Sequence, residues 1–346
     1  MLVAEQSWPQ FRGDNQHSGQ SSERSISKPH LRWKLKVSDL MIQEVAINEY
    51  GTIYVGSEDG CYAINGLTGN QKWSFKTNNC CHGVTFANRQ SFIYVPTDDG
   101  LLYALNSTGK KLWVFEVNGI PTPPTVTSEG YLYLCADKLY TLDTNGSLLW
   151  SFPIPGEVYN SPALSINSQI LYFGSSDGQI YALDLEGNQL WSYKAQGSIF
   201  GPIAVGLDGT IHAASEDGTL YALDNRGNLR WSFKAGGVIH AGPALSQDNM
   251  LYFGSDDGNL YALNSSGHKE WAFQAGSGIF SSPGLTSDGI LYFTSEQGIL
   301  YALNPDGTEK WTFDTRNELS SNPVIGPGGI ICVGANDGTL YAIGEP

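Results

Sequence analysis

The chain has 346 residues, and its 19 Lys and Arg stand against 34 Asp and Glu, which gives a formal net charge of −15 at pH 7. A surface this acidic repels phosphate backbones, so the charge argues against a nucleic-acid partner. No apolar run is long enough to cross a membrane. The opening residues MLVAEQSWPQ also lack the basic start and apolar core of a signal peptide. The sequence leaves two cellular locations: the protein is cytoplasmic if Met1 is native, and periplasmic or secreted if a signal peptide was removed.

From the N-terminus, residues 1–30 show no repeat, and we expect them to form a lead-in that packs on the rest of the chain. An alternating strand follows at residues 31–36. From there to the C-terminus a unit recurs that carries one tryptophan, one tyrosine and a glycine four residues before most of the tryptophans. These tryptophans, 37 to 41 residues apart, are Trp33, Trp73, Trp113, Trp150, Trp191, Trp231, Trp271 and Trp311. A fixed period of this size indicates one supersecondary unit repeated many times.

One unit, residues 238–273, contains four short alternating runs at 243–245, 250–253, 260–263 and 271–273. The sequences SQDN, SDDG and NSSG separate them. Short alternating runs between turn sequences are typical of antiparallel strands joined by hairpins. Four such strands repeated radially form a blade of a β-propeller.

The number of blades follows from the tyrosine-containing strands. There are eight of them, around Tyr62, Tyr103, Tyr140, Tyr181, Tyr221, Tyr261, Tyr301 and Tyr341. The last lacks a tryptophan strand after it, and residues 31–36 form a tryptophan strand with no blade before it. We therefore predict an all-β fold: one eight-bladed propeller of four-stranded antiparallel blades at residues 31–346, closed by residues 31–36. Closure removes an exposed sheet edge.

The tryptophans are interpreted as structural groups that dock one blade against the next, because buried indoles contribute large apolar areas. The acidic turns, such as SDDG at 255–258, resemble calcium loops. However, Asp-Gly is also the favoured two-residue hairpin turn, and these sequences lie between two strands. We therefore predict no metal site.

Residues 63–73, AINGLTGNQKW, resemble the docking motif of quinoprotein-type propellers, A-x-D-x-x-T-G-x-x-x-W, with Asn65 in place of the aspartate. Residues 8–14, WPQFRGD, are similar to the lead-in of bacterial proteins with pyrroloquinoline-quinone-like repeats. This family includes quinone-dependent dehydrogenases and also propellers without a cofactor, such as the lipoprotein of the outer-membrane assembly machine. The resemblance covers residues 31–346 and is closest in character to the cofactor-free branch.

Pyrroloquinoline quinone with calcium is considered as a cofactor and disfavoured. Cys80 and Cys81 resemble the vicinal cysteine pair that lies against the quinone in the alcohol dehydrogenases. Against this, the quinone has three carboxylates that need basic clamps. Only seven arginines are present, of which only Arg316 lies in a loop from a tryptophan strand to the next blade. The corresponding loops also offer few oxygen ligands for calcium.

The loops that enter each innermost strand differ from repeat to repeat and face the axis at one end of the ring. Aromatic and polar groups that converge on a concave mouth favour a binding site. Phe200, His240 and Phe280 occupy corresponding loops and are expected to form an arc, although such rings could equally plug the channel. The candidate ligand-binding residues are Cys81, His82, Tyr159, Asn160, Phe200, His240, Phe280 and Asn322.

These patterns lead to a functional hypothesis without catalytic residues. The chain is interpreted as a non-enzymatic binding or scaffolding propeller that engages a protein or small-molecule ligand through its axial funnel. The alternative is an enzyme with its active site in that funnel, either a quinoprotein dehydrogenase or a propeller catalyst of a biosynthetic pathway. One propeller architecture carries many functions, so the fold does not choose between them.

Overall fold

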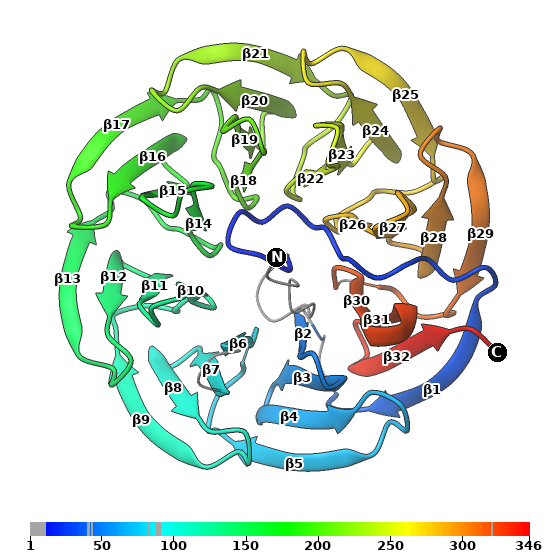
Figure 1. Ribbon diagram of the computed structural model, residues 1–346, viewed down its shortest axis with the longest axis horizontal. Helices are drawn as coiled ribbons and strands as arrows, with labels where there is room; N and C mark the ends of the chain where they lie inside the picture. The colour runs from blue at the N-terminus through cyan, green and yellow to red at the C-terminus, as the bar shows by residue number, and fades with distance from the viewer. Residues whose placement is uncertain (1–11, 40–41, 43, 82, 88–90, 320) are drawn as a thin grey trace, which may run out of the picture.

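The computed structural model describes residues 12–346 except 40–41, 43, 82, 88–90 and 320. Over these residues, eight four-stranded antiparallel sheets stand radially around a central axis, and the predicted eight-bladed fold is confirmed (Figure 1). No described helix is long and apolar enough to cross a membrane.

The first four blades run outward from the axis in chain order. They are formed by β2 (Val45–Ile47), β3 (Thr52–Ser57), β4 (Gly60–Asn65) and β5 (Gln71–Lys76); β6 (Thr85–Ala87), β7 (Phe92–Thr97), β8 (Leu101–Leu105) and β9 (Lys111–Glu116); β10 (Thr125–Val126), β11 (Leu132–Cys135), β12 (Lys138–Leu142) and β13 (Leu148–Pro153); and β14 (Ala163–Leu164), β15 (Ile170–Gly174), β16 (Gln179–Asp184) and β17 (Gln189–Lys194).

The next three blades repeat the same order. They are formed by β18 (Ala204–Val205), β19 (Ile211–Ala214), β20 (Thr219–Leu223) and β21 (Leu229–Lys234); β22 (Ala244–Leu245), β23 (Leu251–Gly254), β24 (Asn259–Leu263) and β25 (Lys269–Gln274); and β26 (Gly284–Leu285), β27 (Leu291–Thr294), β28 (Ile299–Leu303) and β29 (Glu309–Asp314).

The eighth blade joins the two ends of the chain. It contains β30 (Val324–Gly326), a short 3-10 turn (Pro327–Gly329), β31 (Ile330–Gly334), β32 (Thr339–Gly344) and β1 (His30–Lys36). Strand β1 pairs antiparallel with β32, from His30 opposite Gly344 to Lys36 opposite Thr339. Figure 1 shows blue β1 beside red β32. The predicted ring closure by the N-terminal strand is confirmed.

The acidic turns between the second and third strands hold themselves together through their own carboxylates. In the turn of the sixth blade, Asp257 Oδ1 accepts from the Asn259 backbone N at 3.0 Å, and its Oδ2 accepts from Tyr261 Oη at 2.5 Å. Tyr181 and Tyr221 make the same contact with Asp177 and Asp217. In these blades the third-strand tyrosine therefore anchors the hairpin that precedes it.

The outermost-strand tryptophans lie between neighbouring blades. Trp231 packs against His212 of its own blade with ring centroids 5.7 Å apart, and its Nε1 donates to the Ser265 carbonyl of the next blade at 2.9 Å. Gly267 of that turn has φ +79°, and a Cβ there would lie 2.5 Å from the indole. Only glycine combines this positive φ with the close approach of the ring. Six other tryptophans donate from Nε1 to a backbone carbonyl of the next blade in the same way: Trp33, Trp73, Trp113, Trp150, Trp191 and Trp271.

Trp311 needs a different acceptor, because the eighth blade has no turn between β32 and β1. Its Nε1 donates to the carbonyl of Ile26, in the lead-in, at 3.3 Å. Earlier lead-in residues run along four innermost strands. The backbone N atoms of Leu164, Val205, Leu245 and Leu285 donate to the carbonyls of Asn15, Gln16, Ser18 and Gly19. The dark-blue segment that crosses the middle of Figure 1 is this part of the lead-in.

We expect Trp311→Ala to lower the free energy of unfolding by about 3–5 kcal/mol, because it leaves a cavity between the seventh and eighth blades. Trp311 is 8% exposed and packs on Tyr292 with centroids 5.4 Å apart. Chemical denaturation monitored by circular dichroism measures the change. Leu190→Ala is the control, since Leu190 lies on an outermost strand but is 49% exposed. Equal losses in the two variants would contradict the docking role of the tryptophan.

Candidate functional site

Eight residues, one from each blade, occupy corresponding positions around the axis. In each blade, one residue of the innermost strand pairs with an aromatic residue of the second strand, as Ala244 does with Tyr252; in the last blade the partner is Cys332. The residue that occupies the axial position lies two positions before that innermost-strand residue. We call these residues the axial ring: Glu44, Gly83, Pro123, Ser161, Pro202, Gly242, Ser282 and Asn322.

Neighbours in the axial ring contact one another. The Gly242 backbone N donates to Ser282 Oγ at 3.2 Å, and the Ser282 backbone N donates to Asn322 Oδ1 at 2.7 Å. Ser161 Oγ donates to the Pro123 carbonyl at 2.5 Å. Members of the axial ring are therefore joined by hydrogen bonds, and the residues at these positions are small or polar and differ from blade to blade.

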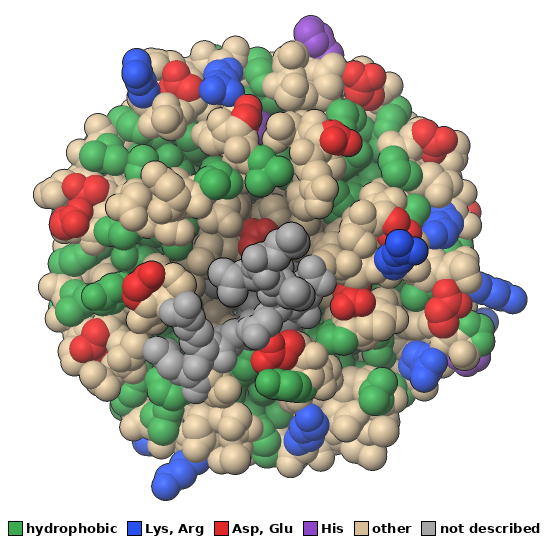
Figure 2. Space-filling view, viewed as in Figure 1, with side chains coloured by type: hydrophobic (Ala, Val, Ile, Leu, Met, Phe, Trp, Pro, Cys, Tyr) green, Lys and Arg blue, Asp and Glu red, His purple; other side chains and the backbone are tan. Residues whose placement is uncertain are grey.

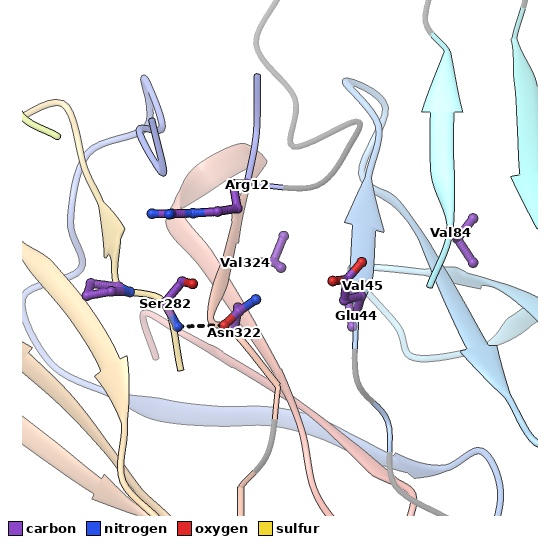
Figure 3. Close-up of a pocket in the computed structure, with 8 residues that line it drawn as sticks. Arg12, Glu44, Val45, Val84, Ser282, Asn322 and Val324 are labelled. Carbon is purple, nitrogen blue, oxygen red and sulfur yellow. Dashed lines mark hydrogen bonds between the residues drawn. The ribbon is translucent and has the colours of Figure 1, made fainter. Parts of the chain in front are cut away.

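A cavity of about 20 Å³ lies inside this ring and is lined by Arg12, Glu44, Val45, Val84, Ser282, Pro283, Asn322 and Val324. The blades supply all of these residues except Arg12, which belongs to the lead-in. Figure 3 shows Arg12 pointing to the side of the segment that carries Ser282 and leads into β26, with Glu44 on the other side of the cavity. The cavity has room for about one or two water-sized groups.

Arg12 is 3% exposed, yet its Nε, Nη1 and Nη2 have no hydrogen-bond partner among the described residues. The guanidinium lies against two glycines: a Cβ added at Gly242 would be 2.5 Å from Nη1, and one at Gly19 would be 2.8 Å from Nη2. Burial lowers the pKa of Arg12 to about 9, so the group is still charged at neutral pH. A buried cation without acceptors is costly.

Asp14 is near Arg12, but its oxygens are engaged by the turn that follows. Oδ1 accepts from the backbone N of Gln16 at 3.0 Å and of Ser18 at 2.9 Å, and Oδ2 accepts from Ser18 Oγ. Burial raises the pKa of Asp14, while these hydrogen bonds and the Arg12 charge oppose the rise. His17, also buried, contacts the Ile203 carbonyl through Nδ1 at 3.1 Å, and burial lowers its pKa to about 3.

Glu44 is the acidic member of the axial ring. Burial raises the pKa of its carboxyl group to about 8, because removal from water penalises the charged form. At neutral pH the group is mostly protonated and can donate a hydrogen bond.

Four aromatic or histidine side chains lie in the loops that lead to the axial ring. Tyr159 and Phe200 meet edge-on with ring centroids 5.0 Å apart, and His240 and Phe280 lie 5.4 Å apart. Tyr159 is 57% exposed and Phe280 43% exposed. We call these four residues the aromatic rim. Of the predicted arc, His240 and Phe280 contact each other, whereas Phe200 contacts Tyr159 of the preceding blade.

The other predicted site residues have different surroundings. Asn160 Nδ2 donates to the Phe200 carbonyl, and Asn322 belongs to the axial ring. Cys81 is buried at 4% exposure and its thiol donates to the Gly83 carbonyl at 3.0 Å. Cys80 and Cys81 are both free thiols, and His82 lies outside the described residues.

Arg12 and Ser282 were not among the candidates from the sequence. Arg12 precedes the first repeat, so comparison of the repeats could not place it on the axis. Ser282 is one of several small residues at its position. Glu44 carried a visible signal, because a carboxylic acid stands where the other blades have Gly, Pro, Ser or Asn.

Comparison with known proteins gives a consistent family and fold. The family model described as outer membrane protein assembly factor BamB matches residues 98–207, 176–280 and 216–345, which together span more than half of the chain. No curated protein sequence is significantly similar to the chain.

Several solved structures share the fold. The structure of BamB from Moraxella catarrhalis is 20% identical, with a TM-score of 0.75 over 92% of this chain and 100% of that chain. A europium-containing methanol dehydrogenase is 14% identical, with a TM-score of 0.82 over 99% and 98% of the two chains. The computationally designed Ika8 protein is 17% identical, with a TM-score of 0.78 over 90% and 98%. At these identities the likeness shows the fold alone.

Among the described residues that line the axial cavity, Arg12 is the one basic side chain, whereas the three carboxylates of pyrroloquinoline quinone need several basic clamps. Among the residues that the structure describes, no group of three or more His, Cys, Asp or Glu side chains could hold a metal ion.

We expect Glu44→Gln to change the pH dependence of stability. The folded-state pKa of Glu44 lies above its usual value of 4.5, so the folded protein binds more protons and loses stability as the pH rises from about 4.5 to about 8. The variant should gain stability over the wild type across this window, by at most about 1.4 kcal/mol per pH unit. Urea denaturation at several pH values measures the difference. Glu186→Gln, at an exposed turn, should show no such trend; parallel curves for Glu44→Gln and the wild type would contradict the burial of an acid on the axis.

Proposed function

Because the chain belongs to the propeller family described as outer membrane protein assembly factor BamB, we propose that it is a non-enzymatic scaffold that binds a protein partner through its aromatic rim. The observation that carries this proposal is the pair of exposed aromatic contacts, Tyr159 with Phe200 and His240 with Phe280. Exposed aromatic side chains held by neighbours are the usual anchors of protein interfaces.

The charge around the aromatic rim favours a basic partner segment. Tyr159 Oη donates to Glu157, and His240 Nε2 lies 3.1 Å from Asp256 Oδ2. The backbone N of Glu296 donates to the carbonyl of Gly278, two residues before Phe280. Glu157, Asp256 and Glu296 are exposed. A segment with Lys or Arg between apolar side chains would complement both the rings and these carboxylates.

On the face shown in Figure 2, the acidic side chains are dispersed among apolar and neutral ones, without one charged patch. The exposed Leu207 lies in a turn at the other end of the innermost strands from the aromatic rim, which makes it a useful control.

We expect a photo-crosslinking amino acid at Tyr159 to capture a protein partner in cells, while the same amino acid at Leu207 does not capture it. The captured protein is identified by mass spectrometry and purified. Phe280→Ala should then weaken its binding about tenfold or more, as the loss of an interface anchor does. Leu207→Ala should leave the dissociation constant unchanged. Both variants should keep the melting temperature of the wild type.

Two results would contradict this assignment of the docking face. One is capture at Leu207 but not at Tyr159. The other is equal affinity of the partner for the wild type and Phe280→Ala.

The enzymatic alternative has its own test. We expect no binding of pyrroloquinoline quinone with calcium by isothermal titration calorimetry, and no dye-linked alcohol oxidation after incubation with both, because Arg12 is the one basic side chain among the described residues that line the axial cavity. Micromolar binding of the quinone, or alcohol oxidation that depends on it, would replace the scaffold with a dehydrogenase.

A further inference from the structure

We propose that the axis of the propeller holds a carboxylate-binding site in which Arg12 binds the anion and Ser282 and Asn322 are its neutral partners. The inference does not depend on the partner-docking role of the aromatic rim. It rests on a buried cation that lines a cavity and whose hydrogen-bond donors have no acceptor among the described residues.

The chain itself leaves the donors of Arg12 unsatisfied. A guanidinium carries five N–H donors and no acceptor, and leaving buried donors unpaired costs stability, more so when they are charged. Asp14 influences Arg12 through its charge. However, its oxygens already accept from Ser18 and Gln16, and no ion pair joins it to Arg12 in the described structure. A water molecule could accept these hydrogen bonds, but only an anion also compensates the buried charge.

The position of the guanidinium is set by the absence of side chains around it. Gly19 and Gly242 leave the space that Nη2 and Nη1 occupy. A fixed, planar guanidinium presents parallel N–H groups that match the two oxygens of a carboxylate. A cavity of about 20 Å³ has room for a compact head group.

The other lining residues are compatible with a negative ligand. Asn322 Oδ1 accepts from the Ser282 backbone N, so the amide Nδ2 of Asn322 is left to donate. Ser282 Oγ accepts from the Gly242 backbone N, and its own proton is left to donate. Glu44, across the cavity, is mostly protonated at neutral pH and does not repel an anion.

Two sources can supply this carboxylate: a free small organic acid, or the C-terminus of a polypeptide. The probes that separate them are formate, triglycine and triglycine amide. Formate and triglycine carry the carboxylate, whereas triglycine amide lacks it.

The test measures binding of these probes to the full chain by saturation-transfer NMR at constant ionic strength set with chloride. We expect formate to bind the wild type, and Arg12→Leu to weaken this binding about tenfold or more, because the bidentate contact is lost. Arg226→Leu is the matched control: it removes an exposed arginine from a turn between outer strands and should leave formate binding unchanged.

Two further variants keep the proposal testable if Arg12→Leu fails to fold. Arg12→Lys keeps the charge but loses the planar fork, and should weaken formate binding. Gly242→Ala adds a Cβ that would lie 2.5 Å from Arg12 Nη1 and also 2.5 Å from Pro202 Cγ. It should shift the guanidinium relative to its loop and weaken binding while the charge of Arg12 remains.

If formate binds and triglycine binds no more tightly than formate, the ligand is a small organic acid. If triglycine binds more tightly than formate and triglycine amide, the ligand is the C-terminus of a polypeptide. Either result supports the carboxylate site. Equal formate binding by the wild type and Arg12→Leu would overturn the proposal. So would a crystal structure grown in formate that shows only water at Arg12.

Discussion

The contact between a tryptophan of one blade and a glycine turn of the next is the interaction on which the rest of this structure depends. It fixes two things at once: the indole fills the wedge between two sheets, and its Nε1 donates to a backbone carbonyl of the neighbouring blade. Trp231 with Ser265 and Gly267 shows the arrangement. Because the contact is made between blades and not within one, a single repeat cannot satisfy it, and stability requires several neighbouring blades.

Closure of the ring determines the position of the lead-in. The eighth blade takes its outermost strand from the N-terminus, so no turn is available to accept from Trp311, and Ile26 supplies the carbonyl instead. The lead-in must therefore reach from the axis to the outer strand. On its way it hydrogen-bonds along four innermost strands and places Arg12 inside the channel. The same segment that completes the ring thus also brings a cation to its axis.

The positions that hold the ring together differ from the candidate binding positions of the repeat. The tryptophans, the glycine turns and the turn aspartates recur from blade to blade because each one joins or shapes sheets. The residues before the innermost strands vary from blade to blade. Among the groups near the axis, Arg12 is buried and Glu44 is half-buried, and removing an ionisable group from water has a free-energy cost.

The sequence by itself determined the blade count, the four-stranded pattern, the closure by residues 31–36 and the loops that carry Tyr159, Phe200, His240 and Phe280. These features are periodic, and a repeat unit is recognisable because every copy solves the same packing problem. The pairing of Tyr159 with Phe200 and of His240 with Phe280, the burial of Cys81 and the axial position of Arg12 were decided only by the tertiary structure. They depend on how loops from different blades, and a segment outside the repeats, meet in space. The period shows which loops are neighbours, but it does not show which rings within them pair or where a segment outside the repeats lies, because such contacts form only after the ring has closed.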